Sequence, residues 1–332
     1  CECARVSLKT IKDAIKDYSA DVVRLFLMAS AEPWQDFDWR EKEVLGTKRR
    51  LNWFKEFASK IEEIKGSPVN LNKIEKVELT RTIDLWMLNQ LNLRIKNATE
   101  ALEIFQTRKA LQESFFLLKK DIDHYMYRTK HLTDSKDPAM IFVLSTVLES
   151  WLRLLAPFTP HTCEEIWSNN GGNGFISQAN WPKYDESLIN PEIERSEEII
   201  QNLVKDINEI KNMVGENKEK VHLYLAPEWK WELYKIADEV GKPDIGQIMG
   251  KAIAANIYDD KKEIANTAKK LGREVTKTKY IGKLDELQII NDALDYITEE
   301  CNSEIIIHND NSYDPKTKAK NAIPYKPAIY ME

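Results

Sequence analysis

The stretch from residue 20 to residue 39 reads ADVVRLFLMASAEPWQDFDW and changes character halfway along. Its first half predicts a helix that Ser19 caps and that carries Asp21 in its first turn, where an acid favours the helix dipole. Apolar side chains at positions i, i+3, i+4 and i+7 form one stripe, namely Val22, Leu25, Phe26 and Ala29. We expect Pro33 to end this helix. The acids and tryptophans that follow it then lead into the next helix.

The same apolar spacing recurs downstream and predicts an antiparallel helical bundle over residues 40–190. Gly66 and Pro68 are expected to end the first of its helices. Thr159-Pro160 has the pattern of an N-cap followed by proline at the first helical position, and predicts a short helix. The longer helices are expected over about 39–64, 80–105, 106–128 and 138–155.

The pattern changes after about residue 190, where strand-like segments first occur. A helix over about 194–214 precedes the β-branched and aromatic segment 221–225, and a second apolar strand is expected at 305–307. Further helices are expected between them, from Pro227 and over about 243–254, 260–271 and 283–300. The sequence therefore predicts a mainly α protein with three parts: a leading segment 1–39, the helical bundle 40–190 and a small mixed α/β domain 191–332.

The whole chain has 332 residues, a formal net charge of −6 and 31% charged residues. This length suffices for two domains with a substantial buried core. The charge gives no global basic signal for nucleic acid, so an RNA-binding surface would have to be local. No apolar run approaches the ~20 residues of a membrane span, and no signal peptide is recognisable. We therefore expect a cytoplasmic protein without a membrane partner.

The sequence offers no recognisable set of residues for catalysis or metal binding. Gly246 and Gly250-Lys251 fall one residue short of a phosphate-binding loop and lack the Ser or Thr that should follow. No Ser/His/Asp or Cys/His set has a supporting local motif. The four cysteines lack the spacing of a zinc site and suit a reducing cytosol: Cys1, Cys3, Cys163 and Cys301. We therefore expect no metal and no catalytic residue in this chain.

Three local runs are basic. Residues 47–60 hold five bases against one acid, residues 258–283 hold eight against four, and residues 309–332 hold four against three with tyrosines between them. Lys and Arg can meet RNA phosphates while aromatic rings stack on unpaired bases. A solvated helix face is the alternative for any single run. Composition alone therefore leaves the function open.

The stretch 20–39 resembles the segment just after the Lys-Met-Ser-Lys-Ser loop in class I aminoacyl-tRNA synthetases of the leucine, isoleucine and valine group. Its acidic and aromatic ending is most similar to the archaeal/eukaryotic type of leucyl-tRNA synthetase. Further stretches resemble, in the same order, that family's bundle helices, its bundle-closing segment and its archaeal C-terminal domain: IDLWMLNQLN (83–92), FQTRKALQESFF (105–116), LLAPFTPHTCEEIW (154–167), GFISQANWP (174–182) and AIPYKPAIYME (322–332). The resemblance covers the chain from about residue 6 to its end.

The resemblance also has departures. The family's His-Ile-Gly-His motif and its Lys-Met-Ser-Lys-Ser loop are absent, and the chain begins CECARVSLKT (1–10) instead. Activation of leucine by ATP needs a phosphate cradle and mobile lysines to stabilise developing charge. We therefore expect this chain alone to be inactive and to bind no cofactor, whereas the intact enzyme would use ATP and Mg²⁺. Residues 1–39 would be a remnant that links the bundle to N-terminal catalytic and editing domains missing from this chain.

The resemblance implies that the intact enzyme esterifies leucine to its tRNA and that this part holds tRNA-Leu by its body and its long variable arm. Candidate phosphate contacts in the bundle are Arg49, Arg50, Arg108, Lys109, Arg128 and Lys130. Those in the second domain are Lys261, Lys262, Lys269, Lys270 and Arg273. Candidate contacts to the variable arm are Lys326, Ile329 and Tyr330.

Other functions stay open at this point. A free-standing RNA-binding module derived from a synthetase would have a native start and would express stably without an upstream partner. A structural protein whose bundle docks the helices of a partner would bind in a salt-insensitive way and without preference for tRNA. Within the enzymes, an isoleucyl or valyl synthetase is the nearest competitor. The Asp38-Trp39-Arg40 ending and the α/β C-terminal domain favour the leucyl type.

Overall fold

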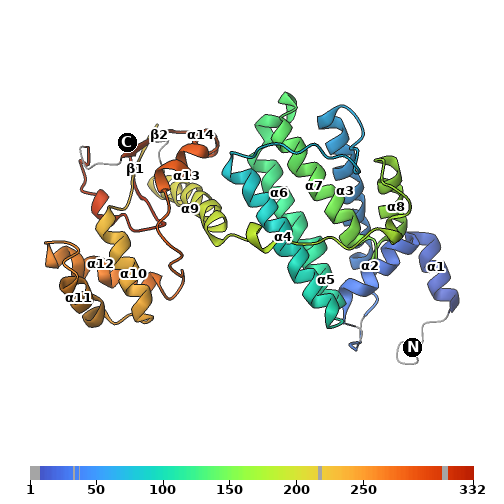
Figure 1. The fold of residues 1–332 in the computed structure, drawn as a ribbon, viewed down its shortest axis with the longest axis horizontal. Helices are drawn as coiled ribbons and strands as arrows, with labels where there is room; N and C mark the ends of the chain where they lie inside the picture. Colours follow the sequence, from blue (N-terminus) through green and yellow to red (C-terminus); the bar gives the residue numbers. More distant parts are fainter. Residues whose placement is uncertain (1–7, 33, 37, 216–218, 309–312) are drawn as a thin grey trace. The chain divides into compact units, whose positions relative to one another are not determined.

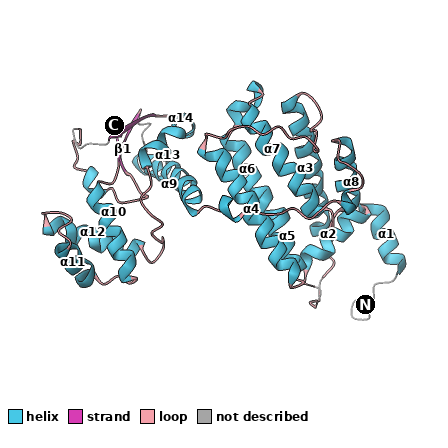
Figure 2. Ribbon diagram, in the orientation of Figure 1, coloured by secondary structure: helices cyan, strands magenta, loops and turns pink. Residues whose placement is uncertain are grey.

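The computed structural model describes residues 8–332 except 33, 37, 216–218 and 309–312. The chain divides into two compact units, Cys1–Ile189 and Asn190–Glu332. In the described residues the first unit is built from helices and loops, and all three strands belong to the second (Figure 2). The predicted fold class, a helical bundle followed by a small mixed α/β part, is confirmed.

The first unit consists of helices that range from 5 to 25 residues, joined by loops (Figure 1). Its helices are α1 (Leu8–Tyr18), α2 (Ala20–Ser30), α3 (Glu41–Lys65), α4 (Thr82–Glu103), α5 (Thr107–Leu111), α6 (Leu118–Arg128), α7 (Pro138–Leu155) and α8 (Pro160–Asn169). Helix α2 begins as expected, because the Ser19 hydroxyl accepts a hydrogen bond from the Val22 amide at 3.5 Å. Helix α3 ends at Gly66, whose φ of 77° lies in the left-handed region that favours glycine. Pro33, expected to end α2, lies outside the described residues.

The predicted helix over 106–128 is not continuous, and this expectation was wrong in detail. A π-helical turn, Gln112–Leu117, separates α5 from α6. Within it the Ser114 carbonyl accepts a hydrogen bond at 2.6 Å from the indole nitrogen of Trp151, a fully buried residue of α7. A π-turn changes the backbone hydrogen-bond pattern, which is how a carbonyl can turn towards a side chain. The carbonyl that the π-turn exposes thus finds its hydrogen-bond donor, Trp151, 37 positions away in the sequence.

Helix α7 forms the centre of the bundle. The centre of the Trp151 ring lies 4.6 Å from that of Phe54 and 5.6 Å from that of Phe57, and both phenylalanines lie on α3. Among the described residues, α7 is the one helix that is long and apolar enough to cross a membrane by length and composition. Most of it is buried, and Leu144, Leu148 and Leu155 are fully so, as in the core helix of a bundle.

The second unit packs helices against one face of a small sheet. Its elements are α9 (Pro191–Val214), β1 (Lys220–Tyr224), α10 (Glu228–Val240), α11 (Ile245–Ala254), α12 (Lys261–Glu274), α13 (Glu286–Asp292), α14 (Leu294–Cys301), β2 (Glu304–His308) and β3 (Ala328–Met331). The strand order is β2-β1-β3, with β1 parallel to β2 and antiparallel to β3. Parallel pairing of β1 and β2 requires a crossover, which helices α10 to α14 supply. The expected helix over 283–300 is shorter at its start and breaks at Ala293.

The strands alternate sides as their period of two requires. Val221 and Leu223 of β1 lie in the main core of the unit, together with residues of α9, α10 and α12. His222 and Tyr224 therefore face the other side of the sheet, where Ala328 and Tyr330 of β3 also lie. The tail that precedes β3 contains a short 3-10 turn, Ala319–Asn321, and an isolated bridge between Ile323 and Lys326.

Candidate nucleic-acid interface

Two acids of the stretch 20–39 hold other helices of the first unit in place. The buried carboxylate of Asp21 accepts hydrogen bonds from the backbone amides of His161 at 3.3 Å and Thr162 at 2.6 Å, at the start of α8. The carboxylate of Glu32 accepts from the amides of Arg108 and Lys109, both at 3.2 Å, at the start of α5. An anionic acceptor satisfies amides that lack a partner within their own helix. Helix α2 and the loop after it thus cap α8 and α5.

The aromatic end of the same stretch anchors the start of α3. The Trp39 ring packs edge-on against Phe26 at 5.2 Å and lies 6.3 Å from Tyr18. The Tyr18 hydroxyl donates to the Glu41 carboxylate at 2.9 Å. These contacts set α3 beside α1 and α2, which brings the basic residues of α3 close to α5.

We call the resulting cavity, of about 710 Å³, the α3–α5 hollow. Its charged wall consists of five cations and one carboxylate: Arg40, Lys42, Arg49, Arg50, Arg108 and Glu43. The guanidinium of Arg50 lies 5.3 Å from the centre of the Phe116 ring, a cation–π distance. Three of the predicted residues, Arg49, Arg50 and Arg108, meet here from separate parts of the chain. The excess of positive charge makes the hollow suited to an anion.

The remaining predicted residues of the first unit lie elsewhere. Lys109 is exposed on α5 but is absent from the wall of the hollow. Lys130 is exposed after α6, and its ammonium lies 4.9 Å from the centre of the Tyr127 ring. Arg128 is only 6% exposed and has a partner within the protein. A buried and partnered guanidinium is not presented to a phosphate, so we remove Arg128 from the candidate set as a correction.

A second cavity, of about 470 Å³, lies between α9, α12 and the tail, and we call it the tail groove. Its charged residues are four cations and three acids: Lys270, Arg273, Lys318, Lys326, Asp206, Glu209 and Glu274. Ile329, one of the predicted variable-arm contacts, also lines it. The basic run of 258–283 and the basic tail therefore meet at one place, although the sequence separates them by some fifty positions.

The other predicted residues of the second unit do not line the tail groove. Lys261, Lys262 and Lys269 are exposed on α12. Tyr330 lies on the opposite face of the sheet from Ile329, with its ring 5.7 Å from that of His222. The sheet therefore separates the side chains of two predicted variable-arm contacts, Ile329 and Tyr330.

A polar cluster on that opposite face was not predicted. The Nδ1 atom of the buried His222 lies 2.8 Å from the Nε2 atom of His308, and its Nε2 atom lies 3.3 Å from the Glu332 carboxylate. The Tyr313 hydroxyl donates to the same carboxylate at 2.7 Å, and this hydrogen bond lowers the pKa of Glu332. The cluster ties the last residue of the chain to β1 and β2. The one sequence signal for this cluster is that His222 and His308 lie in or next to segments with the pattern of strands.

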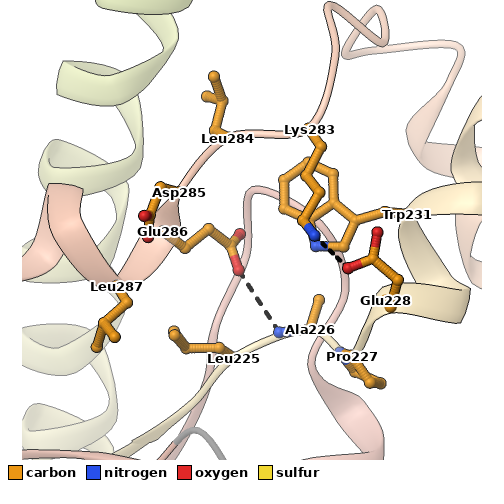
Figure 3. Close-up of a pocket in the computed structure, with 10 residues that line it drawn as sticks. All are labelled: Leu225, Ala226, Pro227, Glu228, Trp231, Lys283, Leu284, Asp285, Glu286 and Leu287. Atoms are coloured by element: carbon orange, nitrogen blue, oxygen red, sulfur yellow. Dashed lines mark hydrogen bonds and ion pairs between the residues drawn. The ribbon is translucent and has the colours of Figure 1, made fainter.

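Two buried ionisable groups hold the tail against the second unit. The carboxylate of Glu286 accepts from the Tyr325 amide at 2.7 Å and from the Ala226 amide at 3.5 Å, the second of which is drawn in Figure 3. Glu286 lines a cavity of about 520 Å³. Burial raises the pKa of Glu286 to about 7. The ammonium of Lys230, which is 1% exposed, donates to the carbonyls of Lys320 and Ala322, and burial lowers its pKa to about 8.

Potential metal ligands and free thiols are the other chemically relevant groups among the described residues. No group of three or more His, Cys, Asp or Glu side chains among them could hold a metal ion. Cys163 and Cys301 are buried free thiols, and burial raises the pKa of Cys163 to about 12, which keeps it protonated and unreactive. Cys1 and Cys3 lie outside the described residues. Of the two cavities described above, the α3–α5 hollow has the clear excess of cations, which suits it to binding an anion.

Comparisons with known proteins show what this chain is similar to. Residues 84–225 match the family model of the anticodon-binding domain of tRNA ligase. The chain is 47% identical over 323 residues to the leucine–tRNA ligase of Methanothermobacter thermautotrophicus, which covers 97% of this chain and 34% of that protein. It is 38% identical over 322 residues to the leucine–tRNA ligase of Pyrococcus abyssi, which covers 96% of this chain and 32% of that protein.

A solved ternary complex of the Agrobacterium radiobacter K84 agnB2 LeuRS with tRNA and LeuAMS matches 57% of this chain and 22% of its own, with a TM-score of 0.44 and 21% identity. The chain spans about a third of the length of the curated relatives that it matches, and it corresponds to their C-terminal part. The chain therefore matches the C-terminal part of leucine–tRNA ligases, which are class I aminoacyl-tRNA synthetases, and it includes a match to their anticodon-binding domain.

Proposed function

We propose that this chain is the tRNA-binding C-terminal portion of a leucine–tRNA ligase and that it holds tRNA-Leu by its body and its long variable arm. In this proposal the α3–α5 hollow contacts the phosphates of the tRNA body, and the tail groove contacts the variable arm. Residues 1–39 connect the catalytic part to the bundle of residues 40–190, and residues 191–332 form the second tRNA-binding domain. A cytoplasmic location belongs to the same proposal.

The observation that carries the proposal is the charge of the α3–α5 hollow. Five cations against one carboxylate line a cavity in a chain whose net charge is −6. Surface cations of a protein with this overall charge are ordinarily interspersed with acids, so such a local excess supports an anionic ligand of extended shape. RNA supplies phosphates at regular spacing, and cations that meet them fix its position without reading its sequence.

The whole ligase would join leucine to tRNA-Leu with ATP and Mg²⁺. The described residues would instead bind and orient the tRNA. Holding the tRNA in a fixed orientation lowers the entropic cost of bringing its acceptor end to a reaction centre.

The test compares two double variants on the same helix. Arg49→Ala/Arg50→Ala removes two cations of the hollow, whereas Lys55→Ala/Lys60→Ala removes two cations that pair with Glu165 at 2.8 Å and Glu63 at 3.2 Å. Binding of the full chain to a tRNA-Leu transcript would be titrated by fluorescence anisotropy from 50 to 200 mM salt. We expect the first variant to reduce the slope of log K against log salt by about 1.4–1.8, or 0.7–0.9 per phosphate.

The control variant should leave that slope close to the wild-type value. Equal losses in the two variants would mean that only net charge matters, and would contradict a role for the hollow. An unchanged slope in the Arg49→Ala/Arg50→Ala variant would also overturn it.

A further inference from the structure

One wall of the tail groove is formed by the tail segment itself. Lys318 and Asn321 belong to the tail, and they face Lys270 and Arg273 of α12 across the groove. Asn321 is exposed and accepts a hydrogen bond from the Lys270 ammonium at 2.8 Å through its side-chain oxygen. The position of this tail segment therefore decides where Lys318 lies relative to the cations of α12.

Lys230 of α10, which is buried inside the unit, holds the segment 318–322 in place. The Lys230 ammonium donates to the Lys320 carbonyl at 2.9 Å and to the Ala322 carbonyl at 2.8 Å. These carbonyls flank Asn321, so the two bonds fix the turn on both sides of the residue that lines the groove. A buried ammonium is costly unless its hydrogen bonds are made, so the site stays intact only while the tail keeps this position.

A second anchor holds the tail a few residues further along the chain. The Tyr325 amide donates to Glu286 at 2.7 Å, and Lys326 follows directly and pairs with Asp206 at 3.6 Å. The bridge between Ile323 and Lys326 closes this part of the tail. The start of the segment is held by Asp314, whose carboxylate accepts hydrogen bonds from the amides of Lys318 at 2.6 Å and Ala319 at 2.8 Å. Lys230 holds the following part from inside the unit, through the carbonyls of Lys320 and Ala322.

We propose that Lys230 is a positioning residue for RNA binding, which holds the turn at 318–322 from inside the unit so that Lys318 and Lys270 together face a phosphate backbone. Lys230 itself is 1% exposed and touches no RNA. This inference rests on the proposed function, because it assumes that the tail groove binds RNA.

The experiment uses the full chain and a tRNA-Leu transcript. Lys230→Met keeps the length of the side chain and removes its donors. The matched control is Lys211→Met: Lys211 of α9 also donates to backbone, to the Cys301 carbonyl, but it does not line the tail groove. Far-UV circular dichroism and thermal unfolding would establish that both variants are folded.

We expect Lys230→Met to reduce the slope of log K against log salt by about 0.7–0.9, the value for one lost phosphate contact. The Lys318→Ala variant should show the same loss, and the combination of both should add nothing, because a displaced Lys318 no longer contributes. Lys211→Met should lower thermal stability and leave the slope unchanged.

A wild-type slope for folded Lys230→Met, or additive losses with Lys318→Ala, would overturn the inference. Should Lys230→Met not fold, Lys318→Ala provides the second test, because it removes the exposed cation that Lys230 is proposed to position. A wild-type slope in that variant would overturn the inference equally. The variant Lys270→Ala/Arg273→Ala separates the two proposals. If it binds tRNA as the wild type does, the groove is no RNA site and the proposed function fails there; if it binds weakly while Lys230→Met does not, only the positioning role fails.

Discussion

The contact of Asp21 with α8 yields a quantitative prediction about what the stretch 20–39 does for the fold. Asp21→Ala removes the acceptor of two backbone amides, at 2.6 and 3.3 Å. Loss of a helix cap costs about 0.5–2 kcal/mol, and a buried donor left without a partner costs about 1–3 kcal/mol. These costs overlap because the same amides are involved, and we expect a loss of about 2–3 kcal/mol in the free energy of unfolding of the first unit.

Two further variants show whether the loss comes from capping. Asp21→Asn keeps one acceptor oxygen, so it should cost about half as much. Asp38→Ala removes an acid from the same stretch, but its ion pair with Arg40 at 3.0 Å joins side chains that are 74% and 64% exposed. An exposed pair of this kind contributes about 0–1 kcal/mol, so this variant should be close to the wild type.

The assay is urea unfolding followed by tryptophan fluorescence. Seven of the nine tryptophans belong to the unit Cys1–Ile189, so the signal reports mainly on that unit. The transition midpoint of Asp21→Ala should fall while the slope of free energy against urea stays the same. If Asp21→Ala costs no more than Asp38→Ala, the capping interpretation is refuted.

Three other predictions concern buried polar groups. Burial raises the pKa of Glu286 to about 7, so between pH 4.5 and 7 the folded state keeps a proton that the unfolded state has released. The contribution of Glu286 to the free energy of unfolding therefore falls as pH rises through that window, by up to about 3 kcal/mol. Glu286→Gln should remove this pH dependence in urea unfolding followed by circular dichroism. Trp151→Phe deprives the Ser114 carbonyl of its donor and leaves a space beside it, and should cost about 2–4 kcal/mol in urea unfolding followed by fluorescence; a loss under 1 kcal/mol would contradict our account of the π-turn. Tyr125→Phe removes a buried 2.6 Å hydrogen bond to Asp84 and should cost about 1–3 kcal/mol, and equal midpoints for variant and wild type would show that this bond contributes nothing.

Local sequence signals predicted much of the fold, because each depends on neighbours within a few positions. The apolar stripes of helical period, the cap at Ser19 and the left-handed end at Gly66 were read in this way and were confirmed. The π-turn was not foreseen, because the Trp151 indole that bonds within it comes from another helix. A contact between distant segments leaves no periodic trace in either of them.

For the same reason, only part of the candidate site could be predicted from the sequence. Basic residues were visible as runs along the chain, but the hollow that collects Arg40 and Lys42 with Arg108 exists only after α3 and α5 have both packed against α2. Burial of Arg128 is decided by the helices around it, so its exclusion could not be foreseen. The caps made by Asp21 and Glu32 across the chain were missed because an acid in an amphipathic segment is ordinarily assigned to its own helix.

The measurement that tests the central proposal most directly is a salt titration of binding between the full chain and tRNA-Leu, with a tRNA-Leu that lacks the long variable arm alongside. We expect the intact tRNA to bind more tightly, with log K falling against log salt by about 0.7–0.9 for each phosphate contacted. The shortened RNA should show weaker binding and a smaller slope. Equal binding of the two RNAs, or no salt-dependent binding of either, would contradict the proposal that this chain holds the body and the variable arm of tRNA-Leu.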